Sequence, residues 1–191
     1  REEKPNFQTL KTHLNEVAEL SKIFGKDFGF PKLCEIASLL HDAGKSTFLW
    51  QEYLKKSITG DKVRKRDHST VGAQLIRKNW LLENQWISSA IESVIMYHHG
   101  SGLPDMISPN GESEFYKRLK KDSCEHELSE VEDKINTLFG NKIQELLSSQ
   151  ELIIEGKKAL LEKCKIKKIG KKQVIFNMGL QLRNFSSCLI D

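Results

Sequence analysis

Apolar residues recur at three- and four-residue spacing along most of the chain, whereas strictly alternating apolar and polar positions are nearly absent. The first pattern is typical of helices with one buried face, and the second would indicate strands. Breaks rich in Gly, Pro, Ser or charged residues separate the helical stretches. The pattern predicts an all-α fold, with helices over residues 7–24, 32–43, 46–56, 68–82, 86–99, 113–121, 126–148, 150–163 and 172–190.

The composition fits one globular domain over residues 1–191, because 38% of the residues are hydrophobic and 29% are charged. No apolar run has the length of a membrane span, and no signal peptide is recognisable. The four cysteines are scattered without a C-x-x-C pair, which favours free thiols in a reducing cytoplasm. The chain begins without methionine and ends within a helical pattern, so we expect a fragment or subunit of a larger system.

The stretch SLLHDAGKST, residues 38–47, has two interpretations. Its end resembles a phosphate-binding loop, but such a loop needs a glycine where this chain has Leu39. The preceding residues carry a helical pattern that starts after Pro31, so the motif ends a helix instead of opening one. Gly44 is then expected at the helix C-terminus, and the His-Asp pair becomes the candidate chemistry.

Five of the six histidines lie on the core-facing edge of an expected helix, and only His126 has a plainly charged setting. Burying several imidazoles without partners is costly, whereas a shared metal centre would satisfy them. Asp42 adds a carboxylate whose two oxygens can bridge two ions, and two ions about 3.5–4 Å apart can clamp a phosphodiester. The five histidines are His13, His41, His68, His98 and His99.

Three segments, HDAGK, DHSTVGAQL and YHHGSGLPD, occur in an order that resembles the HD-domain nuclease of type I CRISPR interference. In that family the domain is a separate protein or the N-terminal part of a helicase-nuclease. The similarity runs from THLNEVAEL to RNFSSCLID, and therefore covers almost the whole chain. It implies an all-helical domain with a metal site at the centre of the helix bundle.

The resemblance also implies roles for individual residues. One metal would be held by His13, His41, Asp42 and Asp191, and a second by Asp42, His68, His98 and His99. Lys45 would lie near the scissile phosphate, and Ser69 would orient a neighbouring ligand. The family's closing aspartate belongs to a D-A-D-like run, whereas this chain stops at the first Asp. The donors favour Mn, Fe, Co, Ni or Zn over Mg.

The activity implied by the resemblance is metal-dependent cleavage of single-stranded DNA. The expected partners are a helicase, in the same chain or separate, and a crRNA-guided surveillance complex. The basic residues Lys62, Arg64, Lys65 and Arg66 directly precede His68, and we expect them to contact DNA phosphates. A solvated lysine-rich loop is the alternative for this segment.

Three other functions remain open from the sequence. An HD nucleotide or cyclic-dinucleotide phosphohydrolase would share the ligands, but such phosphodiesterases show an E-x-x-D-G-x-G-Y-P motif that this chain lacks. The HD part of the large subunit in other CRISPR effector complexes performs similar cleavage. A catalytically inactive HD docking module is the non-enzymatic alternative, although no expected ligand type is missing.

Overall fold

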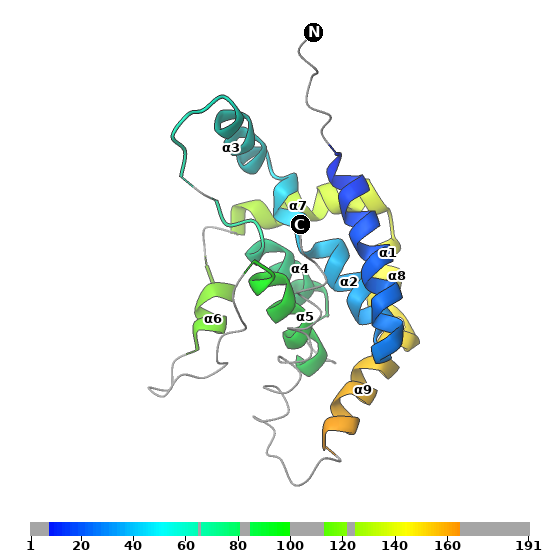
Figure 1. Ribbon diagram of the computed structural model, residues 1–191. Coiled ribbons are helices and arrows are strands. Elements are labelled where there is room, and N and C mark those ends of the chain that lie inside the picture. The colour runs from blue at the N-terminus through cyan, green and yellow to red at the C-terminus, as the bar shows by residue number, and fades with distance from the viewer. Residues whose placement is uncertain (1–7, 65, 81–84, 100–112, 122–124, 165–191) are drawn as a thin grey trace.

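The computed structural model describes residues 8–64, 66–80, 85–99, 113–121 and 125–164, and these ranges contain helices but no strand (Figure 1). The all-α prediction is therefore confirmed. The predicted helix over 172–190 lies outside the described residues. The elements are α1 (Leu10–Phe28), α2 (Pro31–Leu40), the 3-10 helix η1 (Ala43–Ser46), α3 (Phe48–Ile58), α4 (Thr70–Trp80), α5 (Gln85–Tyr97), α6 (Glu114–Leu119), α7 (Glu125–Phe139), α8 (Lys142–Ser148) and α9 (Gln150–Cys164).

Two predicted helix boundaries are wrong, each because of a glycine. The expected break at Gly25 does not occur, since α1 continues to Phe28 and ends at Gly29, whose φ of 80° is left-handed. Gly25 is needed inside the helix because an added Cβ would lie 2.9 Å from the sulfur of Cys34 on α2. Conversely, the predicted helix over 126–148 is two helices, α7 and α8, separated at Gly140 with its φ of 57°.

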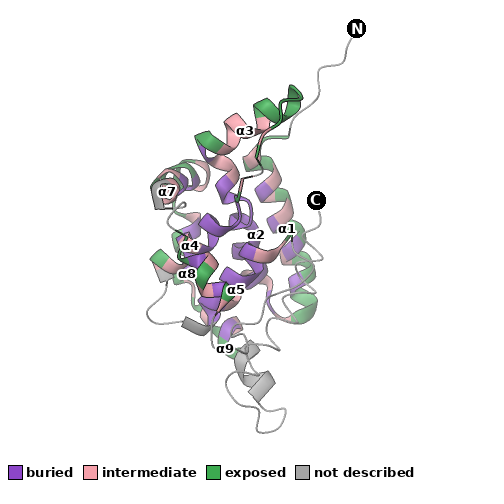
Figure 2. Ribbon diagram, turned by 90° about the vertical axis from the view of Figure 1, so that its left-hand side faces the viewer, coloured by how far each residue is buried: buried purple, intermediate pink, exposed green. Residues whose placement is uncertain are grey.

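Helix α2 forms the centre of the core. Pro31 occupies its first turn as predicted, and all residues from Leu33 to Leu40 are buried, including Glu35. Figure 2 shows this buried helix surrounded by partly exposed elements, with α1 alongside it. The carboxylate of Glu35 is held by the ammonium groups of Lys22, Lys32 and Lys142 at 3.3–3.6 Å.

Helices α4 and α5 complete the core near α2. The α4 residue Gly72 lies so close to α2 that a Cβ there would be 2.2 Å from the carbonyl oxygen of Leu40. Ile91 and Ile95 of α5 are at most 1% exposed. No helix among the described residues is long and apolar enough to cross a membrane. The fold thus brings the C-terminal ends of α2 and α5 close to the start of α4.

Candidate metal centre

Asp42 lies at the centre of the site, in the short break between α2 and η1. Helix α2 ends at Leu40 and η1 begins at Ala43, so His41 and Asp42 follow the buried helix directly. Both residues are 0% exposed. A carboxylate in such a position must be matched by positive charge or by hydrogen-bond donors.

One side of the Asp42 carboxylate faces two histidines, and we call His13, His41 and Asp42 the first group. The oxygen Oδ2 lies 3.2 Å from Nε2 of His13 on α1 and 3.3 Å from Nε2 of His41. These two nitrogens are themselves 3.4 Å apart. The three donor atoms lie within 4.8 Å of one another, close enough to hold one metal ion.

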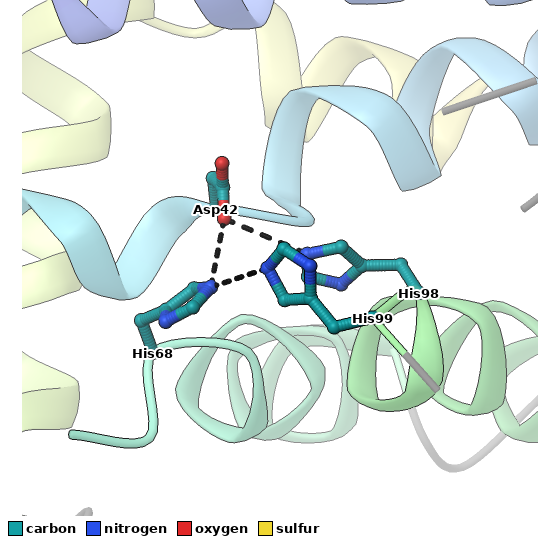
Figure 3. Close-up of side chains that lie close together, drawn as sticks. All are labelled: Asp42, His68, His98 and His99. Atoms are coloured by element: carbon teal, nitrogen blue, oxygen red, sulfur yellow. Dashed lines mark hydrogen bonds and ion pairs between the residues drawn. The ribbon is translucent and has the colours of Figure 1, made fainter. Parts of the chain in front are cut away.

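The other side of the carboxylate faces three histidines, and Asp42, His68, His98 and His99 are the second group (Figure 3). Oδ1 lies 3.1 Å from Nε2 of His68, which precedes α4, and 3.6 Å from Nε2 of His98 at the end of α5. Nε2 of His68 is 2.9 Å from Nε2 of His99. Asp42 is therefore shared by both groups through different oxygens.

In two of these histidines, the ring nitrogen that faces away from Asp42 is held by a backbone carbonyl group. Nδ1 of His41 lies 2.7 Å from the carbonyl oxygen of Ser38, and Nδ1 of His98 lies 2.7 Å from that of Ile95. A carbonyl oxygen only accepts, so each Nδ1 carries the proton and donates it. In a neutral ring, Nε2 then presents a lone pair toward Asp42, which is the orientation of a metal-ligating histidine.

A lone pair facing a carboxylate oxygen is unfavourable unless a positive charge lies between the two atoms. Both Asp42 oxygens and Nε2 of His98 are buried without a partner in hydrogen-bond geometry among the described residues. Protonating every imidazole would supply positive charge, but like charges would then meet where Nε2 of His68 and His99 are 2.9 Å apart. A divalent cation in each group fits these donors better.

The electrostatics keep Asp42 ionised. Burial raises the pKa of Asp42, but contacts in which the imidazoles of His41, His68 and His98 act as donors outweigh burial and hold this pKa far below its ordinary value, and a metal ion in each group would take over that role. Lys45, three residues further on, places Nζ 2.5 Å from Oδ2 and 5.6 Å from the centre of the Trp50 ring. Lys45 thus lies beside Asp42, and its place near the scissile phosphate stays a prediction.

Backbone contacts hold the two halves of the site together. The N–H of Gly44 donates to the carbonyl oxygen of His68 at 3.2 Å, and a Cβ on Gly44 would lie only 2.2 Å from that oxygen. Gly44 was expected to end a helix. This interpretation is wrong, because Gly44 lies inside η1 and the absence of a side chain permits close approach to the His68 segment.

A second set of contacts ties His68 to α5 and α6. The hydroxyl of Ser69 donates to the carbonyl oxygen of Met96 at 3.2 Å, two residues before His98. Arg118 of α6 donates to Ser69 Oγ at 2.8 Å and to Asp67 Oδ1 at 3.2 Å. Ser69 therefore joins the segment that carries His68 to the helix that carries His98 and His99, whereas its orienting role stays a prediction.

Asp67 and Arg118 help to hold the segment that carries His68, and the sequence interpretation did not identify either residue. Oδ1 of Asp67 accepts from the backbone N–H groups of Ser69 and Thr70, both at 3.2 Å, and so caps the start of α4. Burial raises the pKa of Asp67, but hydrogen bonds from Thr70 and the charge of Arg118 lower it well below its usual value. An Asp before Ser-Thr is a cap signal in the sequence, but nothing there pairs it with Arg118.

The structure brings together six of the seven expected metal ligands, and their binding of metal remains a prediction. Asp191 and Lys65 lie outside the described residues, as does the side chain of His126. Lys62 and Arg64 are exposed, while Arg66 lies 3.6 Å from Glu127 Oε1. The six convergent residues are His13, His41, Asp42, His68, His98 and His99.

A model of the HD domain family matches residues 10–138. A comparison with curated proteins gave no match. The family match covers more than half of the chain and includes all six convergent residues. The chain therefore belongs to the HD domain family, whose members bind divalent metals and are typically metal-dependent phosphohydrolases.

Proposed function

We propose that this HD-domain protein is a nuclease that hydrolyses phosphodiester bonds of single-stranded DNA in type I CRISPR interference. It would act with a helicase that supplies the strand and with a crRNA-guided surveillance complex. The observation that carries the proposal is the sharing of Asp42 between two histidine groups, one of which includes His68 directly after a segment in which Lys62 and Arg64 are exposed. We call residues 62–66 the basic segment.

Each group would hold one divalent ion, the first through His13, His41 and Asp42 and the second through Asp42, His68, His98 and His99. When bound, two such ions supply Lewis-acid activation of a phosphodiester and of the attacking water. The imidazole donors suit Mn, Fe, Co, Ni or Zn better than Mg. Asp191 stays a proposed additional ligand of the first ion.

The residues of the chain itself hold this centre in one arrangement. The backbone carbonyls of Ser38 and Ile95 fix the rings of His41 and His98, so that little rearrangement is needed on binding. Asp42 keeps its negative charge at neutral pH because the ammonium group of Lys45 lies 2.5 Å from Oδ2. Lys45, 22% exposed at the side chain, can turn its ammonium group from Asp42 toward a phosphate oxygen of the substrate.

The surroundings favour a long anionic substrate. Lys62 and Arg64 have no ion-pair partner among the described residues and are exposed beside the segment that carries His68. Such side chains neutralise phosphates along a strand and release counterions. An isolated nucleotide has no chain of phosphodiesters to occupy them. This charge distribution therefore supports a polynucleotide substrate for the shared metal centre.

The test begins with metal analysis of the purified protein, because an inactive docking module would lack bound metal. The loaded protein is then assayed against single-stranded DNA, duplex DNA, a cyclic dinucleotide and deoxynucleoside triphosphates, with Asp42→Ala as the control. Metal-dependent cleavage confined to single-stranded DNA supports the proposal. Hydrolysis of the cyclic dinucleotide or of the triphosphates, with DNA left intact, would overturn it.

A further inference from the structure

Helix α3 differs from the other long helices because none of its residues is buried. It nevertheless carries large apolar side chains: Phe48 is 64% exposed, Leu49 45% and Ile58 56%. In Figure 1 the helix projects from the rest of the bundle and continues into the chain that leads to α4. An apolar helix that contributes nothing to the core needs another explanation.

The inner face of α3 connects to the metal centre through Trp50. The centre of its ring lies 6.0 Å from that of His68, in an edge-on arrangement, and 6.1 Å from that of Tyr53. Trp50 and Tyr53 are three positions apart, so they lie on the same side of the helix. The aromatic surface therefore begins at a residue of the second group and extends outward along α3.

Positive charge accompanies this aromatic surface. The end of α3 carries Lys55 and Lys56, and Lys62 and Arg64 follow in the basic segment. Lys56 is three positions after Tyr53 and therefore lies on the same side of the helix, where the acidic residue Glu52 approaches it only to 3.9 Å. Aromatic rings beside exposed cations suit a ligand with flat apolar faces and a chain of negative charges.

We infer that Trp50 and Tyr53 form a stacking platform for the bases of a single-stranded nucleic acid next to the metal centre. Lys56, Lys62 and Arg64 contact the phosphates of the same strand. This inference rests on the proposed function and adds the route by which the strand reaches the centre. Stacking on aromatic rings is tolerant of sequence, because every base has a flat face.

The platform accounts for the single-stranded substrate of the proposed function. In a duplex the bases stack on one another and are paired, so their faces are not available to Trp50 or Tyr53. A single strand exposes these faces, and two successive bases can stack while the intervening phosphate points toward the lysines. Selection against duplex DNA then arises on α3, before the strand meets Asp42.

The first experiment measures the fluorescence of Trp50 during binding of an oligothymidylate of about 12 nucleotides, a length within the range that one small domain covers. A chelator is present so that no strand is cut. The sequence contains three tryptophans, and Trp50→Phe identifies the signal that belongs to Trp50. We expect the strand to quench wild-type fluorescence and the quenching to disappear in Trp50→Phe.

The second experiment compares affinities for the same oligothymidylate. Trp50→Ala and Tyr53→Ala should each weaken binding roughly 5- to 100-fold, the range for loss of one base-aromatic stack. Phe24→Ala is the matched control, because this aromatic is 45% exposed on α1 and lies outside the platform. None of the three changes should alter the dependence of affinity on salt, since none removes a charge.

Unchanged affinity in both Trp50→Ala and Tyr53→Ala would overturn the platform, as would a Trp50 signal that does not respond to the strand. Because binding is measured without catalysis, the result is separable from the proposed function. Quenching without any DNA hydrolysis by the metal-loaded protein would overturn the nuclease proposal and leave the platform standing. If the metal-loaded protein hydrolysed DNA but neither aromatic substitution changed the affinity, the platform would be overturned and the nuclease proposal would stand.

Discussion

Replacing Gly44 with alanine tests the link between backbone packing and the metal centre. The added Cβ would lie 2.2 Å from the carbonyl oxygen of His68, 2.7 Å from its Cα and 2.8 Å from its carbonyl carbon. All three are backbone atoms, so no side chain can rotate away. Ordinary contact begins at 3.4 Å, and the His68 segment must therefore move by about 1 Å.

This displacement is large compared with the contacts of the second group. His68 Nε2 is 3.1 Å from Asp42 Oδ1 and 2.9 Å from His99 Nε2, whereas His13 and His41 of the first group face Oδ2. We expect overpacking to destabilise the protein by about 1–3 kcal/mol. A misplacement of about 1 Å in a catalytic arrangement lowers a rate by about 100-fold, and we expect a loss of that order.

The assay combines urea unfolding, metal content and hydrolysis of single-stranded DNA. Gly60→Ala is the matched control, because Gly60 has a φ of 85° but nothing within 4 Å of the added Cβ. The control should lose about 1 kcal/mol from backbone strain and keep its metal and activity. If Gly44→Ala kept wild-type metal content and turnover, the close approach to His68 would have no role in forming the second group.

Asp42→Ala should abolish hydrolysis and reduce bound metal without unfolding the protein, because both groups lose their shared ligand; activity within a few-fold of wild type would refute this. Neutralising the four charges of the basic segment should weaken binding of single-stranded DNA. The slope of log affinity against log salt concentration should become shallower by about 0.7 for each phosphate contact that is lost, while metal content stays the same. Burial raises the pKa of Glu155 despite hydrogen bonds from the backbone of Lys32 and Leu33, so the folded protein binds this proton more tightly than the unfolded chain. Wild type should therefore gain stability relative to Glu155→Gln as the pH falls from the raised pKa of the folded state to the ordinary glutamate pKa. The same difference between the urea midpoints of the two proteins at pH 4 and at pH 7 would contradict the sign.

The sequence predicted the convergent residues because periodicity carries three-dimensional information. A histidine that continues an apolar stripe is expected to point toward the core, and several such stripes share one core in a domain of this size. His41 and His68 are buried as expected, whereas His13 is half-buried and His99 is exposed. His41 and Asp42 followed directly from the end of the α2 pattern, and both are fully buried. The pattern could not assign Oδ1 and Oδ2 of Asp42 to different groups, because that depends on how helices distant in sequence approach each other.

Glycines produced the main errors, since one residue type serves opposite purposes. Gly140 ends α7 through a positive φ, whereas Gly25 lies inside α1 because Cys34 of α2 leaves no room for a side chain. In the sequence both glycines directly follow a phenylalanine and precede a polar residue, so their local contexts look alike. The conformation of Gly140 is local, but the reason for Gly25 is a contact with another helix, which no local pattern contains.

Two glycines beside the metal centre, Gly44 and Gly72, both affect the distance between His68 and Asp42. Gly44 allows the η1 backbone to meet the carbonyl of His68, and Gly72 allows α4 to meet the carbonyl of Leu40, just before the His-Asp pair. Each contact joins the end of α2 to the segment that begins α4, and together they fix how far His68 stands from Asp42. Glycine at these two positions therefore fits a site in which one carboxylate is shared between imidazoles from separate segments of the chain.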